Sequence, residues 1–449
     1  MTHLHVPEWG RIAVGPDGFS LTQAEALLAA ARAHPMGGED GSAILTDHRH
    51  YLRAKQMVGV IAAPGCSLEI LPKVDPEAEL GDLPTVRSRL ISLLDLALGL
   101  NLADGAQAAM AHGAENLLDI LIRLFAQRLL GLARRGLPRA YQARAEDLPT
   151  LRGKLDIVRQ LTVHVGRPDR LACRFDVLSS DIPLMQVMKA AVIFLSKLAR
   201  AHDTRRLLEE LRFVLADVAD VPISALPWEK VRIDRTSQRW ETVFALAKLL
   251  LRRDWQGTTF DHRSHNGITL LFPMNDLFEA AVAALLRRAL SGSGISVVEQ
   301  GGLRHCLGEW TKDEECEGHV FQTRPDILLR RGGKDLAIID TKWKCLALDA
   351  SVAKRGVAQG DVYQMMAYSR LYRCDRLMLL YPAVAGSGTA LSHRFGIAGG
   401  REMLALGLVD LTTQLNHVQG ELGKLISDFL PGDTSYAAVS RFTTRNSKF

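Results

Sequence analysis

The sequence predicts a multidomain α/β protein. Its 449 residues leave room for about three domains at a typical ~150 residues each. Hydrophobic residues make up 47% and charged residues 23%, a globular composition that is ample for a buried core. Apolar residues follow both helix and strand patterns near the N-terminus, mainly the helix period in the middle, and both patterns again towards the C-terminus.

Four regions follow from these patterns. We expect a mixed α/β domain over residues 1–110, a mostly helical region over 111–258, and a second α/β domain over 259–430. The polar stretch 256–267 contains glycine and has no period, so it is the expected linker into the last domain. Residues 431–449 form a polar tail.

Individual elements can be placed within these regions. Strand-like runs at 58–61 and 68–73 are separated by an Ala-Pro-Gly turn signal. Helical apolar spacing recurs at residues 21–31, 86–98, 117–132, 184–198, 240–251, 277–290, 361–372 and 415–430. Arg152 and Lys154 alternate with apolar residues, which would give one basic strand face. We favour the interpretation that this face is exposed to solvent, on a strand that lies beside a core. The alternative is that its basic side chains contact phosphate groups.

The stretch from Phe321 to Lys344 has the pattern of a β-hairpin. Two short apolar runs, at 326–329 and 336–339, flank a turn centred on two glycines. A three-residue loop would place Asp326 opposite Asp340, and a two-residue loop would offset them by one position. In either case two carboxylates meet at the open end of one hairpin.

Lys342 follows Asp340 by two positions, so the strand period points both side chains to the same face. Two acids and a lysine at one sheet edge can bind Mg²⁺ and activate a water molecule against a phosphodiester. The carbonyl of Thr341 is a candidate further ligand. The alternative reading is a solvated strand end, because an Asp-x-Lys triplet also arises by chance.

The flanking helices add further candidates. Glu279 lies in the first turn of the helix that Asn275 or Asp276 would cap, where the helix dipole stabilises a negative charge. Gln364 and Tyr368 are four residues apart and share one helix face, for a role at the site or for core packing. A buried strand at residues 376–381 and β patterning at 395 and 404–411 would complete the sheet.

Pro325-Asp326, thirteen residues and then Asp340-Thr341-Lys342 resemble the PD-(D/E)xK nuclease motif, and Gln-x-x-x-Tyr on the next helix resembles its RecB-like branch. The order of motifs over roughly residues 50–410 is similar to that of the McrC family, the nuclease subunit of McrBC restriction systems. The segments that carry this similarity are Pro72-Lys73, 151–156, 274–279, 324–326, 340–344 and 363–368.

The resemblance implies a restriction-endonuclease-like C-terminal domain that cuts DNA with Mg²⁺. Asp326, Asp340 and Glu279 would hold the metal, Lys342 would position the attacking water, and Gln364 and Tyr368 would orient the site or the nucleic acid. It also implies a partner, McrB, a GTP-hydrolysing AAA+ ring that recognises methylated cytosine. The N-terminal part would contact that ring and stimulate its hydrolysis.

Other features of the sequence agree with a partner-dependent nuclease. No G-x-x-x-x-G-K-[ST] phosphate loop occurs, so GTP chemistry would have to come from another chain. A net charge of +5 suits a polyanionic partner such as DNA. Six cysteines without CxxC spacing predict reduced, mostly buried thiols, and no run of 18 apolar residues exists. We therefore expect a cytoplasmic protein that does not enter a membrane.

Two alternatives remain open. In the first, the chain is a RecB-like repair or recombination nuclease that acts alone. In the second, it is a non-catalytic activator of an AAA+ ring that retains a nuclease-like fold. The presence of Asp326, Asp340 and Lys342 argues against the second alternative.

Overall fold

The computed structural model describes residues 2–38, 40–73, 82–100, 116–235, 237–252, 268–310, 316–346, 354–384, 387–411 and 415–430. The chain divides into two compact units, Met1–Ala103 with Phe260–Phe449, and Asp104–Thr259. Residues that the sequence assigns to a first and a third region thus share one unit. The predicted linker at 256–267 and the tail at 431–449 lie outside the described residues. The expected mixed α/β architecture is confirmed.

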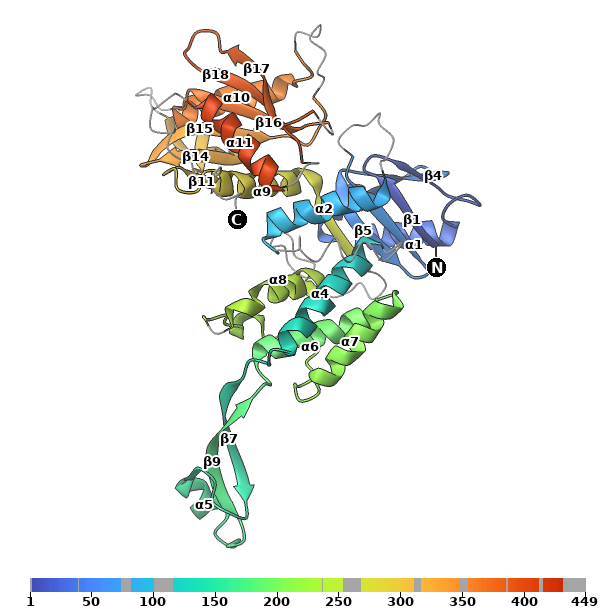
Figure 1. Cartoon of the computed structure of the whole chain (residues 1–449), viewed down its shortest axis with the longest axis vertical. Coiled ribbons are helices and arrows are strands. Elements are labelled where there is room, and N and C mark those ends of the chain that lie inside the picture. The colour runs from blue at the N-terminus through green and yellow to red at the C-terminus, as the bar shows by residue number, and fades with distance from the viewer. Residues whose placement is uncertain are drawn as a thin grey trace, which may run out of the picture. The chain divides into compact units, whose positions relative to one another are not determined.

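Two small sheets form the N-terminal part of the first unit (Figure 1). Their orders are β1-β6-β5-β10 and β2-β4-β3. The elements here are β1 (Thr2–Pro7), β2 (Arg11–Ala13), α1 (Leu21–Arg32), β3 (Leu45–Asp47), β4 (Tyr51–Ala54), β5 (Met57–Ala63), β6 (Cys66–Leu71), α2 (Leu83–Leu98) and β10 (Ile268–Pro273). The predicted strands and both predicted helices of this region are present.

Strand β10 joins two distant stretches of the chain. It pairs antiparallel with β5, with Leu271 opposite Gly59. Gly59 has φ +130°, and a Cβ there would lie 2.0 Å from the backbone oxygen of Leu270. Only glycine allows this close approach of the two strands. The pairing makes residues 268–273 part of the N-terminal sheet, before the chain enters the second, larger sheet.

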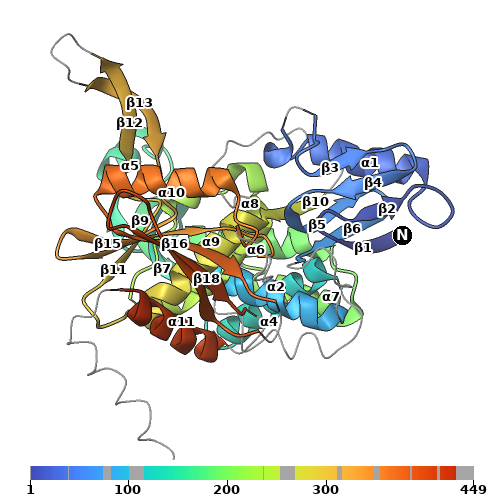
Figure 2. The same cartoon turned by 90° about the horizontal axis from the view of Figure 1, so that it is seen from above.

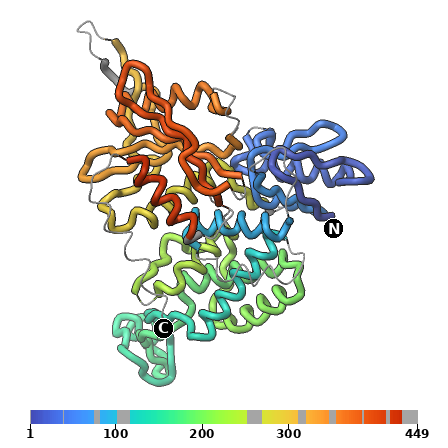
Figure 3. The backbone as a smooth tube through the Cα atoms, turned by 45° about the horizontal axis from the view of Figure 1, so that its top comes forward, coloured from blue at the N-terminus to red at the C-terminus, as the bar shows by residue number. Residues whose placement is uncertain are grey.

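The six-stranded sheet has the order β11-β14-β15-β16-β18-β17, with β15, β16 and β18 parallel. Helix α10 packs on the face that carries Ile338 and Leu379, and α9 and α11 pack on the other face (Figures 2 and 3). The elements are α9 (Met274–Ala289), β11 (Ser296–Glu299), β14 (Ile327–Arg331), β15 (Lys334–Thr341), α10 (Gln359–Tyr372), β16 (Arg376–Pro382), β17 (Ala390–Gly396), β18 (Met403–Val409) and α11 (Leu415–Phe429). A separate hairpin, β12 (Arg304–Trp310) with β13 (Cys316–Thr323), completes the unit.

The start of α9 differs from the prediction. Neither Asn275 nor Asp276 caps it; the cap position is Pro273, which has no side-chain hydrogen bond. The reason is that β10 runs directly into the helix, and the backbone N–H of Met274 donates to the carbonyl of Gln56 instead. The Asn275 side chain is engaged with the same glutamine, whose Nε2 donates to Asn275 Oδ1 at 3.1 Å.

The second unit contains more β structure than expected. Its helices are α4 (Leu117–Ala133), α5 (Ile157–Val163), α6 (Pro183–Ser196), α7 (His202–Val214) and α8 (Glu241–Arg252), and a ribbon of β7 (Ala140–Leu148), β8 (Lys154–Leu155) and β9 (Leu171–Ser179) projects from them (Figure 1). The predicted basic strand face is wrong, because only Lys154 and Leu155 are in a strand. Gly153, at φ +69°, bends the chain there, and Arg152 packs its guanidinium over the Phe175 ring.

Two further findings concern the described residues alone. No helix among them has the length and apolar character needed to cross a membrane. Cys66, Cys173 and Cys374 are buried free thiols, Cys345 is a half-buried one and Cys306 an exposed one.

Candidate active site

The hairpin brings the two predicted acids together through an irregular register. Gly332 and Gly333, at φ +55° and +81°, form a two-residue turn that pairs Arg331 with Lys334. A bulge follows, because Arg330 pairs with Asp335 but Leu329 pairs with Ala337. Leu336 is the additional residue. The register beyond the bulge, Ile327 with Ile339, places Asp326 and Asp340 at the next opposed position.

Asp340 lies at the end of β15 and its side chain is fully buried. Lys342 Nζ contacts Asp340 Oδ2 at 2.6 Å, as the strand period predicts. Asp340 Oδ1 has no hydrogen-bond partner among the described residues. Burial, reinforced by the charge of Asp326, raises the pKa of Asp340 to about 6 in spite of the lysine. A buried carboxylate oxygen without a donor is an oxygen available to a cation.

Asp326 is held by the residue that follows Asp340. The backbone N–H and the hydroxyl of Thr341 both donate to Asp326 Oδ2, at 2.7 and 2.9 Å. Burial raises the pKa of Asp326, and these two hydrogen bonds oppose the shift. In this structure Thr341 therefore orients an acid with its N–H and hydroxyl, besides the ligand role predicted for its carbonyl.

Glu279 lies in the second turn of α9 and not in the first as predicted, because the helix begins at Met274 and Asp276 is its first-turn acid. Burial and then the negative charge of Asp326 raise the pKa of Glu279 to about 8, while a hydrogen bond with Gln300 lowers it. The pKa values of Glu279, Asp326 and Asp340 are thus all raised, the condition that a bound divalent cation would relieve.

Gln364 and Tyr368 connect α10 to the lysine. Lys342 Nζ donates to Gln364 Oε1 at 3.4 Å, and Gln364 Nε2 donates to the Tyr368 hydroxyl at 2.8 Å. That hydroxyl donates to the carbonyl of Arg324 at 3.2 Å. The Tyr368 ring is also buried and packs edge-on against Tyr372. Tyr368 is therefore both a core residue and part of a hydrogen-bond chain that begins at Lys342, so the two roles predicted for it coexist.

Two polar residues near the site were not predicted. Gln300, after β11, hydrogen-bonds Glu279 and accepts from Arg324 Nη2. Asp361 pairs with Lys344 at 2.6 Å, and its charge acts on both Asp340 and Lys342. Asp361 could have been found from the sequence, because it lies three residues before Gln364 on the same helix. No sequence signal marked Gln300.

The arrangement fits a divalent cation in part. Among the described residues, no three His, Cys, Asp or Glu side chains already converge as a ligand set. Lys342 and Thr341 instead occupy one oxygen each of Asp340 and Asp326. The buried free oxygen Asp340 Oδ1, beside two further acids with raised pKa, is the feature that suits Mg²⁺.

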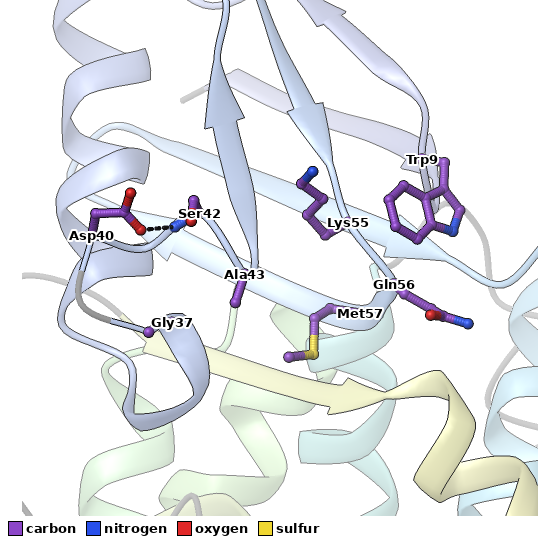
Figure 4. Close-up of a pocket in the computed structure, with 9 residues that line it drawn as sticks. Trp9, Gly37, Asp40, Ser42, Ala43, Lys55, Gln56 and Met57 are labelled. Atoms are coloured by element: carbon purple, nitrogen blue, oxygen red, sulfur yellow. Dashed lines mark hydrogen bonds between the residues drawn. The ribbon is translucent and has the colours of Figure 1, made fainter. Parts of the chain in front are cut away.

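A cavity of about 710 Å³ lies elsewhere in this unit, at the N-terminal sheets (Figure 4). Its lining includes Trp9, Asp40, Lys55, Gln56 and Met57, and none of the candidate site residues.

Comparison with known proteins identifies the family to which the chain belongs. Residues 52–382 match the family model of the McrBC 5-methylcytosine restriction system component. The chain belongs to this family. The match spans the hairpin, α9 and α10, and so includes every candidate site residue. The resemblance to McrC drawn from the sequence is thereby confirmed.

The relatives are distant in sequence and similar in fold. The curated Type IV methyl-directed restriction enzyme EcoKMcrBC of Escherichia coli (strain K12) is 21% identical over 296 residues, which are 63% of this chain and 81% of that protein. A chain of the half-complex of Thermococcus gammatolerans McrB AAA+ hexamers with bound McrC is 19% identical, with a TM-score of 0.71 over 95% of this chain and 100% of the other. A chain of the Thermococcus gammatolerans McrBC complex is 23% identical, with a TM-score of 0.53 over 65% and 88%.

Proposed function

We propose that this chain is the Mg²⁺-dependent endonuclease subunit of a modification-dependent restriction system, and that its six-stranded sheet is a PD-(D/E)xK nuclease domain. The single observation that carries the proposal is Asp340. It is fully buried, its Oδ1 has no hydrogen-bond donor among the described residues, and it lies between Asp326 and Lys342. A solvated strand end, the alternative reading, would leave this carboxylate in water.

Asp340 Oδ1 and Asp326 would hold the cation, with Glu279 and the carbonyl of Thr341 as further ligands. Mg²⁺ lowers the pKa of a bound water and neutralises charge on the phosphate. Lys342 would orient the attacking water and stabilise negative charge on the phosphoryl oxygens. Asp340 and Gln364 keep its ammonium at the site. Although burial lowers the pKa of Lys342, the charge of Asp340 raises it above the ordinary value, so the side chain stays cationic.

We further propose that DNA cleavage requires a second protein, an AAA+ GTPase of the McrB type, and that methylated DNA is the substrate. One similar Thermococcus structure contains McrB AAA+ hexamers with bound McrC, and the curated relative is named as methyl-directed. The absence of a phosphate loop in this sequence supports the same division of labour. A cytoplasmic location would follow for such a system.

Reconstitution tests this proposal. The purified chain is mixed with an AAA+ GTPase of the McrB type from the same organism, methylated plasmid, GTP and Mg²⁺. We expect cleavage only when all components are present and the plasmid is methylated. Efficient cutting by the chain alone, without nucleotide, would favour the stand-alone repair nuclease. Stimulated GTP hydrolysis without any cutting would favour the non-catalytic activator.

A further inference from the structure

Trp343, the residue after Lys342, is held by the N-terminal sheets. Its indole Nε1–H donates to Glu8 Oε1 at 2.6 Å, although the two residues are 335 positions apart. Gln56 Nε2 donates to the backbone carbonyl of Trp343 at 3.2 Å. Both partners come from the part of the first unit that contains none of the candidate nuclease residues. Trp343 itself is 7% exposed.

The same junction reaches the helix that carries Glu279. Gln56 Nε2 also donates to Asn275 Oδ1 at 3.1 Å, and the Gln56 carbonyl accepts from the N–H of Met274. The Trp343 ring lies against the Phe278 ring, with centroids 5.4 Å apart. Phe278 immediately precedes Glu279. The junction thus touches the chain next to Lys342 and next to Glu279 at once.

The sheet does not fix this part of the chain. Strand β15 ends at Thr341, and the last hydrogen bond towards β16 is from the Lys342 N–H to the Leu380 carbonyl, at 2.9 Å. Trp343 lies beyond it, in a turn where the Lys344 N–H donates to the Lys342 carbonyl at 3.0 Å and side-chain contacts hold the tryptophan. The bonds from Glu8 and Gln56 supply those contacts.

Burial of the Glu8 carboxyl group, which accepts the hydrogen bond from Trp343, destabilises its charged form. Its side chain is 3% exposed, and burial raises its pKa to about 7, against the hydrogen bonds from Lys73 N–H and Trp343. Its second oxygen, Oε2, has no hydrogen-bond partner among the described residues. A buried ionisable group in this condition lowers stability, and such groups are concentrated where a protein has a functional need.

We propose that Glu8 and Gln56 are positioning residues for phosphodiester cleavage, acting through Trp343 to fix the place of Lys342 and, through α9, of Glu279. This proposal rests on the nuclease function proposed above. The N-terminal sheets then form part of the nuclease and are more than a surface for a partner. A displacement of a reacting group by about 1 Å can cost on the order of a hundredfold in rate.

Four variants test the role in the complete system, with kcat and KM for methylated DNA measured separately. Trp343→Phe keeps an aromatic ring opposite Phe278, although a smaller one, and removes the indole N–H donor. Glu8→Ala removes its acceptor, Gln56→Ala removes the second contact, and Glu8→Gln restores an acceptor at Oε1. We expect Trp343→Phe, Glu8→Ala and Gln56→Ala to lower kcat roughly tenfold or more, with KM changed less than about threefold. Glu8→Gln should recover most of the activity.

Two controls keep the outcomes distinct. Leu27→Ala, on the buried face of α1, destabilises the same N-terminal part without touching the junction. It should lower the melting temperature and leave kcat near wild type below that temperature. A kcat loss in Leu27→Ala as large as in Trp343→Phe would overturn the positioning role, and so would unchanged kcat in Trp343→Phe and Glu8→Ala. Activity retained in Asp340→Ala would instead overturn the nuclease proposal itself.

Discussion

Asp326 and Asp340 face each other across the open end of the β14–β15 hairpin, although its two-residue turn alone would offset them by one position. The bulge at Leu336 makes up the difference. Both side chains consequently lie on the face of the sheet that carries Leu328 and Ile338, beneath α10. The site depends on this register, because a one-residue slip would turn one acid to the opposite face.

The raised pKa values predict how metal binding responds to pH. Asp340 and Glu279 have pKa values of about 6 and 8 and must lose their protons to ligate a cation. Mg²⁺ affinity should therefore rise steadily from pH 6 to pH 8.5, by at least tenfold as an order of magnitude. Calorimetric titration with Mg²⁺ at several pH values measures this. In Glu279→Gln the rise should end nearer pH 7. Affinity that does not change with pH would contradict the assignment of these acids as ligands.

Glu8 gives a prediction for stability. Its pKa is about 7 in the folded chain against 4.5 ordinarily, so the folded state binds more protons than the unfolded state between these pH values. Stability is therefore lost as the pH rises from about 4.5 to 7, by roughly 3 kcal/mol for this group. Glu8→Gln removes the ionisation. It should raise the melting temperature at pH 8 by several degrees more than at pH 5. An equal effect at both pH values would show that Glu8 ionises freely.

A substitution at Tyr368 distinguishes a role in core packing from a role in DNA cleavage. Tyr368→Phe keeps the buried ring and removes only the hydroxyl that joins Gln364 to the Arg324 carbonyl. We expect cleavage to fall about tenfold, while stability changes by about 1 kcal/mol, the usual size of one hydrogen bond. Tyr372→Phe is the matched control, since that hydroxyl lies on the same helix and bonds Thr323 instead. Equal cleavage by the two variants would assign Tyr368 to the core alone.

The sequence revealed the local features of this fold and missed the long-range ones. The two glycines and the apolar runs around them predicted the hairpin, and the period of two predicted the Asp340–Lys342 pair. The exact register could not be read, because the bulge at Leu336 is set by packing of the sheet. Likewise, nothing near Trp343 in the sequence indicates Glu8, which reaches it only through the tertiary fold.

The ribbon in the second unit was missed for a different reason. Strand β7, AYQARAEDL, has no buried residue, so no alternation of apolar and polar positions marks it as a strand. Its pairing with β9 along nine positions compensates for the missing core. Strand β10 was missed because its apolar run continues into α9, and the boundary depends on its pairing with β5.

The central claim is that the buried hairpin acids perform cleavage, and Asp340→Ala tests it most directly. Plasmid cutting and GTP hydrolysis are measured in one preparation that contains the AAA+ GTPase partner, with Lys342→Ala alongside. The account predicts that cutting falls by orders of magnitude in both variants while stimulated GTP hydrolysis continues, and that Lys342→Ala still binds Mg²⁺, because an ammonium does not ligate a cation. Undiminished cutting by Asp340→Ala would contradict it.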